Sequence, residues 1–372
     1  MVVWRNCQLL LLCLITVTIN AQTSNTFSRN VGDAAPPLRI REWIKGKPFQ
    51  KFENGKFYVI EFWASWCKPC IAAMPHISRL AAQYKDKIAF LGVDILENKT
   101  TSTKKIKSFV DSMGLQMNYA VAIEDSSFMV TGWLDAFDER GIPKTFVINT
   151  EGRVAWIGQP KELDEALSKI INDEWNIKEV LAKRNLNRRL EELDDSLNYE
   201  LKRYIDNPFK PGDLGKPDSA LLEIHEIVSN EPRLKYAPII ANHTFYSLLK
   251  TNPHKAYEYG KTVITTSTYT SPAFDAIIGP IEWYSDKLNL PLEIYQLGAE
   301  AYQAKIDSYP YPEIVNIPKL YHKMAEWYWR AKDKSKAINA IQKAIQIMKD
   351  RKNIPAKEID VLESLLKQYK KM

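Results

Sequence analysis

The sequence shows no strong excess of charge of either sign. Its 51 lysines and arginines nearly balance 45 aspartates and glutamates, which leaves a net charge of +6. The basic clusters near Lys104 and Arg188 are interleaved with acidic residues or followed by them, as on a solvated helix face. We therefore expect no nucleic-acid partner. With 45% hydrophobic and 26% charged residues, the composition gives no indication of long disordered tracts.

The apolar run near the N-terminus is too short to span a bilayer. Arg5 precedes the apolar residues 9–15, whereas a membrane-spanning helix needs roughly 20 such residues. This pattern is typical of an export signal, and we expect a signal peptide over residues 1–21, cleaved after Ala21. A cleavage site favours a small residue at the third position before the cleaved bond, where this sequence has Ile19. An uncleaved membrane anchor therefore stays as the alternative. We expect an exported protein, in the periplasm or cell envelope.

Cysteine is scarce. Removal of the signal peptide takes away two of the four cysteines and leaves Cys67 and Cys70. Two cysteines cannot form the framework of disulfides that staples distant segments of a small secreted domain. A single close pair in a compartment that permits disulfides therefore indicates redox chemistry.

The chain is longer than one hydrophobic core usually organises, so we expect two folded units. From about 57 to 158, short apolar strands alternate with helices, which is typical of an α/β sheet. The predicted strands are 57–63, 88–93, 119–123, 145–148 and 154–157, and the predicted helices are 70–84, 104–113 and 127–137. A hairpin turn over 149–152 joins the last two strands.

After Pro160 the strand signals stop, and helical periodicity punctuated by prolines follows. We therefore expect an α/β domain over residues 22–160 and an all-helical domain over residues 161–372. The Pro- and Gly-containing stretch 207–213 is typical of a linker, after a charged helical run.

Several segments carry a resemblance to a known family. They are Glu61 to Cys70, which ends in Trp66-Cys67-Lys68-Pro69-Cys70, then Gly141 to Ile148, and Val31 to Pro36. With the extra strand and helix over 94–123, they resemble the thioredoxin superfamily and, within it, the TlpA/ResA-like branch of exported membrane-tethered or periplasmic enzymes. The resemblance covers roughly residues 31–160 and implies a thioredoxin-like α/β domain.

The Cys67 and Cys70 pair is the predicted catalytic centre. A strand ending at Ala64 and a helix starting near Cys67 place the first thiol at a helix N-terminus, where its thiolate is favoured. The neighbouring Lys68 adds a positive charge that favours the thiolate further. We expect Cys67 to attack, and Cys70, one turn deeper, to resolve the mixed disulfide. Lys68 and Pro69, which we also expect to contact substrate, suit a reducing potential.

Other roles for the pair fit the sequence less well. A structural zinc site needs four ligands, and His76, which we expect to be simply exposed, is the only further candidate nearby. An inert disulfide stays as an alternative. A peroxidase would need a separate peroxidatic cysteine, which the mature chain lacks. We expect no metal and no organic cofactor.

Pro143 matches the cis-proline loop of the superfamily. An X-Pro bond adopts the cis form at small cost, and a cis bond would expose the Ile142 backbone opposite the thiols for pairing with a substrate peptide. Trp66 and Ile142 would then form apolar rims around the substrate disulfide. The alternative is an ordinary trans proline before a strand.

Glu61 is the one charged residue of an otherwise apolar strand, and a buried carboxylate is costly without a reason. It matches the buried acidic residue of thioredoxins, which implies proton exchange with the resolving cysteine. The TlpA/ResA-like branch often carries a glutamate where this chain has Ala73, so we expect Glu61 to act alone. The alternative is a glutamate that reaches solvent and pairs with a lysine.

The helical half contains one stretch that resembles a tetratricopeptide repeat. It comprises residues 324–329, Asp333, Ala337-Ile338 and residues 343–345, and residues 297–302 and 254–259 look like degenerate fragments of similar units. Their irregular spacing leaves a plain helical bundle as an equal alternative.

Together these features predict a thiol-disulfide oxidoreductase, a reductase of disulfides in exported proteins. Its electrons would come from an unidentified membrane thiol-disulfide reductase, and its helical domain would bind a protein partner. The competing hypothesis is a helical binding or scaffold module with only accessory redox activity.

Overall fold

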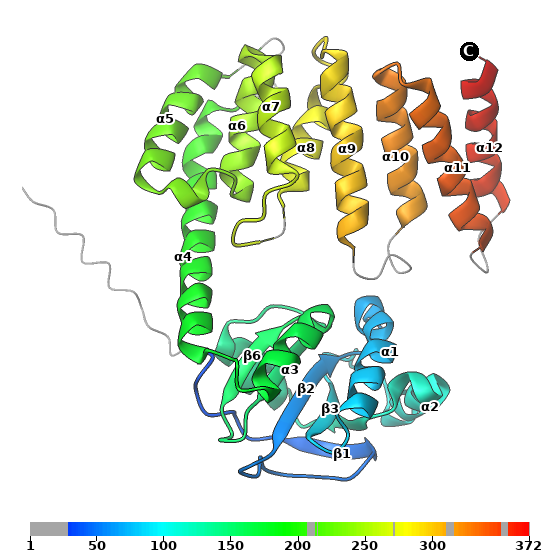
Figure 1. The fold of residues 1–372 in the computed structure, drawn as a ribbon. Helices are drawn as coiled ribbons and strands as arrows, with labels where there is room; N and C mark the ends of the chain where they lie inside the picture. Colours follow the sequence, from blue (N-terminus) through cyan, green and yellow to red (C-terminus); the bar gives the residue numbers. More distant parts are fainter. Residues whose placement is uncertain are drawn as a thin grey trace, which may run out of the picture.

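The computed structural model describes residues 29–206, 213, 215–270, 272–309, 316–350 and 356–371. The expected signal peptide and most of the expected linker, residues 207–212, lie outside the described residues. Figure 1 shows an α/β unit and a row of helices, joined by the long helix α4 (Ile177–Leu201). Within the described ranges, no helix is both long and apolar enough to cross a membrane.

The α/β unit is built on one sheet with the strand order β1-β4-β3-β2-β5-β6. Its strands are β1 (Ile40–Lys45), β2 (Phe57–Trp63), β3 (Ile88–Asp94), β4 (Ala120–Glu124), β5 (Lys144–Ile148) and β6 (Val154–Gly158). The strands β2, β3 and β4 run parallel, and the other three are antiparallel to their neighbours. The central strands are buried on both faces, which explains their continuous apolar sequences.

The two faces of the sheet are covered differently. Along β2, Val59 and Trp63 face a cluster formed with α1 (Lys68–Gln83), α2 (Thr103–Met113) and α3 (Leu163–Ile171). The alternate residues Ile60 and Phe62 face a second, aromatic cluster that contains Trp133. The helix that carries the cysteines therefore lies on the face toward which every odd-numbered residue of β2 points.

The strands predicted from the sequence are confirmed, and so is the fold class of an α/β unit followed by helices. The predicted helix over 127–137 is confirmed as a helical segment over 128–137, but it is not a regular α-helix. That segment forms a π-helical turn over Val130–Leu134 and a 3-10 turn over Asp135–Phe137. Trp133 and Leu134 are buried against the sheet together with Met129. Strand β1 is an element that the sequence analysis does not predict.

Helix α3 belongs to the core of the α/β unit. Leu163, Leu167 and Ile170 pack in the same cluster as the cysteines, and the Trp175 indole donates to the Ala155 carbonyl at 2.8 Å. The division of the chain at residue 160 stays a prediction, and this packing favours a break after α3.

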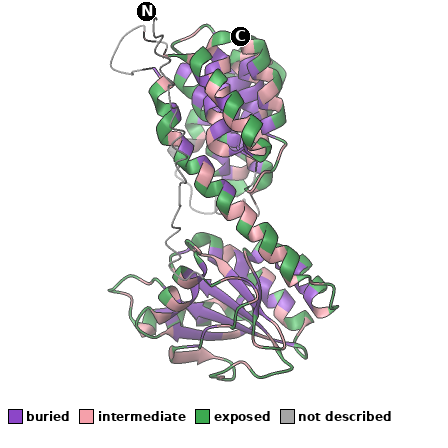
Figure 2. Cartoon of the chain, turned by 90° about the vertical axis from the view of Figure 1, so that its left-hand side faces the viewer, coloured by how far each residue is buried: buried purple, intermediate pink, exposed green. Residues whose placement is uncertain are grey.

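The second half of the described chain is helical. Its helices after α4 are α5 (Pro217–Asn230), α6 (Pro238–Thr251), α7 (Pro253–Val263), α8 (Phe274–Tyr284), α9 (Leu292–Ser308), α10 (Ile317–Arg330), α11 (Lys334–Asp350) and α12 (Ala356–Lys371). Figure 2 shows buried residues inside this row and inside the sheet, whereas the stretch of α4 between them is largely exposed or half-buried. Whether the row is a true repeat array stays a prediction.

Candidate active site

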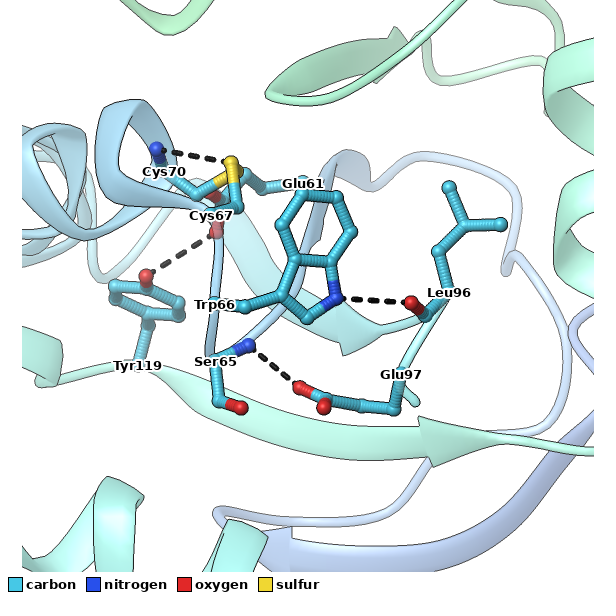
Figure 3. Close-up of a disulfide and its surroundings, with 8 residues drawn as sticks. All are labelled: Glu61, Ser65, Trp66, Cys67, Cys70, Leu96, Glu97 and Tyr119. Atoms are coloured by element: carbon cyan, nitrogen blue, oxygen red, sulfur yellow. Dashed lines mark hydrogen bonds between the residues drawn. A yellow bond between two sulfur atoms is a disulfide. The ribbon is translucent and has the colours of Figure 1, made fainter. Parts of the chain in front are cut away.

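Cys67 is the N-cap residue of α1, and Cys70 lies in the first turn of that helix. Their sulfur atoms form a disulfide of 2.07 Å, which Figure 3 shows with its surroundings. The Cys67 sulfur also accepts a hydrogen bond from the Cys70 N–H at 3.3 Å. Amide groups at a helix N-terminus favour negative charge, so this position suits a thiolate once the pair is reduced. Cys67 is 3% exposed and Cys70 is fully buried.

The turn before Cys67 is held by the segment that follows β3. The Ser65 N–H donates to Glu97 Oε1 at 2.5 Å, and the Trp66 indole donates to the Leu96 carbonyl at 2.9 Å (Figure 3). The Trp66 side chain is nevertheless 50% exposed, and Leu96 is exposed as well. The two side chains form an apolar surface beside the disulfide.

Glu61 lies in β2 and shares the sheet face of Val59 and Trp63, the face that α1 covers. It is 1% exposed, and its Oε2 atom accepts a hydrogen bond from the Tyr119 hydroxyl at 3.2 Å. Its Oε1 atom has no hydrogen-bond partner among the described residues. Burial raises the pKa of Glu61 to about 8, against the opposing effect of the Tyr119 hydrogen bond. The alternative of a solvent-exposed Glu61 paired with a lysine is therefore wrong.

A second buried carboxylate lies close by, at the end of β3. Asp94 is opposite Trp63 in the parallel ladder and is 1% exposed. Burial, together with the neighbouring Glu97 carboxylate, raises the pKa of Asp94 to about 9. Asp94, Glu97 and Tyr119 are not predicted from the sequence as site residues. A carboxylate directly after an apolar strand was the available signal for Asp94.

The Ile142–Pro143 peptide bond is cis, so the alternative of a trans proline is wrong. The loop leads directly into β5, whose first residue, Lys144, pairs with Phe62 near the end of β2. Ile142 is half-buried and packs against the core clusters on both sheet faces. The loop therefore lies next to the strand that ends just before the cysteine turn.

The remaining predicted residues lie around the start of α1. Lys68 and Pro69 are exposed. His76, which the sequence predicts to be simply exposed, is half-buried, and its Nε2 atom lies 2.8 Å from an Asp164 carboxylate oxygen on α3. Among the described residues, no group of three or more His, Cys, Asp or Glu is arranged to hold a metal ion.

Comparisons with known proteins match the α/β part of the chain. The model of the AhpC/TSA family matches residues 31–157. Protein FixW of Rhizobium leguminosarum is 29% identical over 152 residues, which cover 40% of this chain and 69% of that protein. The crystal structure of StoA from Bacillus subtilis aligns with a TM-score of 0.30 and 17% identity, over 36% of this chain and 99% of that one.

The thiol-disulfide oxidoreductase ResA of Bacillus subtilis (strain 168) is 30% identical over 149 residues, which cover 39% of this chain and 77% of that protein. ResA of Oceanobacillus iheyensis is also 30% identical, over 44% of this chain and 85% of that protein. The matches span most of each relative, and the Cys67–Cys70 disulfide lies within the matched unit. Through its α/β unit, the chain belongs to the ResA-like thiol-disulfide oxidoreductases of the thioredoxin superfamily.

Proposed function

We propose that this oxidoreductase works as a reductase of disulfides in exported proteins. The observation that carries the proposal is the position of Cys67, the N-cap of α1, with Cys70 fully buried behind it and Glu61 buried on the sheet face that this helix covers. The exposed Lys68 and Pro69 between the cysteines suit a reducing pair.

The first step is attack on the substrate. The Cys67 thiolate attacks one sulfur of a substrate disulfide, the substrate S–S bond breaks, and the other substrate sulfur leaves as a thiolate. A mixed disulfide between Cys67 and the substrate remains. The Cys70 N–H that donates to the Cys67 sulfur supports negative charge there before the attack.

The second step releases the reduced substrate. Cys70 loses its proton and attacks the Cys67 sulfur, so the mixed disulfide breaks and the second substrate thiolate leaves. Two electrons have then passed from the cysteine pair to the substrate, and the pair is in the disulfide form of the structure. Glu61 in its ionised form is the proposed acceptor of the Cys70 proton.

Substrate recognition is assigned to the surface around the pair. The exposed Trp66 and the half-buried Ile142 would flank the substrate disulfide, and the backbone before Pro143 would pair with the substrate chain. Lys68 and Pro69 complete the contact surface. Holding the disulfide in line with the Cys67 sulfur raises the rate of attack by orientation.

The setting of the reaction follows from the expected signal peptide. In an exported enzyme the oxidised pair must be reduced again, and we assign this step to a membrane thiol-disulfide reductase that supplies two electrons. We assign the binding of a protein partner to the helical half. The competing function is a helical scaffold with accessory redox activity, and the helices α5 to α12, which the reaction does not need, are the observation that favours it.

A trapping experiment separates the two functions. The Cys70→Ser variant lacks the resolving sulfur, so it should accumulate mixed disulfides through Cys67 with proteins of the cell envelope. The double variant Cys67→Ser, Cys70→Ser is the matched control and should trap none. If the Cys70→Ser variant forms no mixed disulfide, the reductase function is rejected and the scaffold function is favoured.

A further inference from the structure

The loop that holds Ile142 and Pro143 is closed at its base by an ion pair. Glu139 precedes the loop and Lys144 follows it, with Glu139 Oε2 and Lys144 Nζ 2.5 Å apart. The two side chains are only 9% and 15% exposed, so water and salt screen the pair weakly. Among the described residues, no side chain of 140–143 forms a hydrogen bond or an ion pair. The polar contacts that place the loop are therefore at its two ends, and Ile142 adds apolar packing between them.

Helix α4 fastens the first of these two ends. Arg184 pairs with the other oxygen of the Glu139 carboxylate and donates to the Phe137 carbonyl at 2.9 Å. Arg188, one turn later, donates to the same carbonyl at 3.3 Å and lies 3.2 Å from an Asp138 carboxylate oxygen. A planar guanidinium is suited to holding two acceptors at once, so α4 fixes both the backbone and the carboxylate of this segment.

The contact between α4 and the α/β unit is mainly polar. A cleft of about 930 Å³ separates part of the helix from β6 and α3, and Trp156 and Trp175 line it. The Asn30 amide donates to Asn185 Oδ1 at 2.7 Å, which adds one more polar contact. The ion pairs of Arg184 with Glu139 and of Arg188 with Asp138 are thus among the main links between α4 and the α/β unit.

The other end of α4 is built into the helical half. Leu190, Leu197 and Leu201 pack in a cluster with residues of α5 and α6. The Asp194 carboxylate accepts the first N–H groups of α6, from Ile239 at 2.9 Å and Ile240 at 3.1 Å. At 1.5 Å per residue, only about 15 Å of helix separates Arg184 from this anchor.

We propose that Arg184, Glu139 and Lys144 are positioning residues through which the helical half places the substrate-binding loop. The inference rests on the proposed function, because the loop has a role only if a substrate pairs with it. A displaced loop weakens the binding of an extended protein disulfide. Attack on a small disulfide that makes no contact with the loop is unaffected.

The placement is tested by hydrogen exchange in the oxidised full-length protein. Arg184→Met should raise the exchange rate of the Asp138 and Glu139 amides at the base of the loop about tenfold. These amides donate to the Asp135 and Leu134 carbonyls, and the variant removes the charge-assisted hydrogen bonds that hold their segment. Arg184→Lys, which keeps the charge, should fall between this variant and the wild type. Lys169→Met removes the exposed pair with Glu165 on α3 and is the matched control, with no change expected. Equal exchange in the wild type and Arg184→Met overturns the inference.

The role in substrate binding is tested by kinetics on the same proteins. The Arg184→Met variant should show a several-fold higher KM for insulin with little change in kcat. Its rate of disulfide reduction with a small aromatic disulfide as substrate should equal that of the wild type. An unchanged KM despite faster exchange overturns that role. If Arg184→Met does not fold, Arg184→Lys and Glu139→Gln carry both tests. A wild type that fails to reduce insulin rejects the proposed function alone, because the exchange result does not depend on activity.

Discussion

Replacing Glu61 with glutamine should stabilise the oxidised protein, by an amount that grows with pH. The pKa of Glu61 is about 8 in the folded protein, against an ordinary value of 4.5. Between these values the folded protein keeps a proton that the unfolded chain has lost, so the free energy of unfolding falls as pH rises. At about 1.4 kcal/mol per pKa unit, the loss approaches an upper limit of roughly 5 kcal/mol above pH 8. Glutamine stays uncharged, so the Glu61→Gln variant does not lose this free energy of unfolding as pH rises.

The assay is denaturant unfolding of the oxidised wild type and Glu61→Gln at pH 5, 7 and 9. Near pH 5 the stability gain from the substitution should be smallest, and by pH 9 it should have grown by on the order of 3 to 4 kcal/mol. Glu165→Gln is the control, because Glu165 is exposed and its pKa is lowered by Lys169. A gain for Glu61→Gln that is constant from pH 5 to 9 would refute a raised pKa and the reasoning built on it.

The same substitution should slow release of the mixed disulfide while attack by Cys67 stays nearly normal. With a pKa of about 8, only about a tenth of Glu61 is ionised at pH 7, so release in the wild type should accelerate up to about pH 8. Glu61→Gln should lose this dependence. Equal release rates for the two proteins would reject Glu61 as the proton acceptor.

Three further outcomes are expected. In the reduced protein, the Cys67 pKa should lie below the free-thiol value of about 8.5, measured by thiolate absorbance against pH; a higher value contradicts the N-cap argument. Glu97→Ala leaves the Ser65 N–H without its acceptor and should lower the free energy of unfolding by about 1–3 kcal/mol, while an unchanged midpoint would show that this hydrogen bond does not hold the turn. A chain ended after Gln159 loses α3 from the core and should not fold, whereas one ended after Trp175 should; equal circular dichroism melting curves would favour the boundary at 160.

Where the sequence predicts the fold correctly, the signal is local. Strand β2 is an apolar run, and α1 follows a turn, so both are visible within a few residues. Strand β1 is not predicted because its pairing with β4 is irregular before Glu42 and after Trp43, which breaks the alternation of apolar residues. The segment 127–137 has the apolar content of a helix and is helical, but no local pattern predicts that its turns are of the π and 3-10 types.

The same limit applies to the active site. Cys67 and the cis bond before Pro143 are predictable because their motifs are contiguous. Tyr119 is 58 residues away from Glu61, and Arg184 is 45 residues away from Glu139. Such contacts depend on the register of the sheet and on the direction in which α4 leaves it, and neither is encoded in a local pattern.

The reduction of insulin disulfides, driven by dithiothreitol, tests the central claim most directly. The wild-type protein should accelerate it, because the Cys67 thiolate attacks faster than the small thiol from its position at the start of α1. Cys67→Ser should bring the rate down to that of dithiothreitol alone. Retention of a tenth or more of the wild-type acceleration by Cys67→Ser would contradict the assignment of Cys67 as the attacking sulfur.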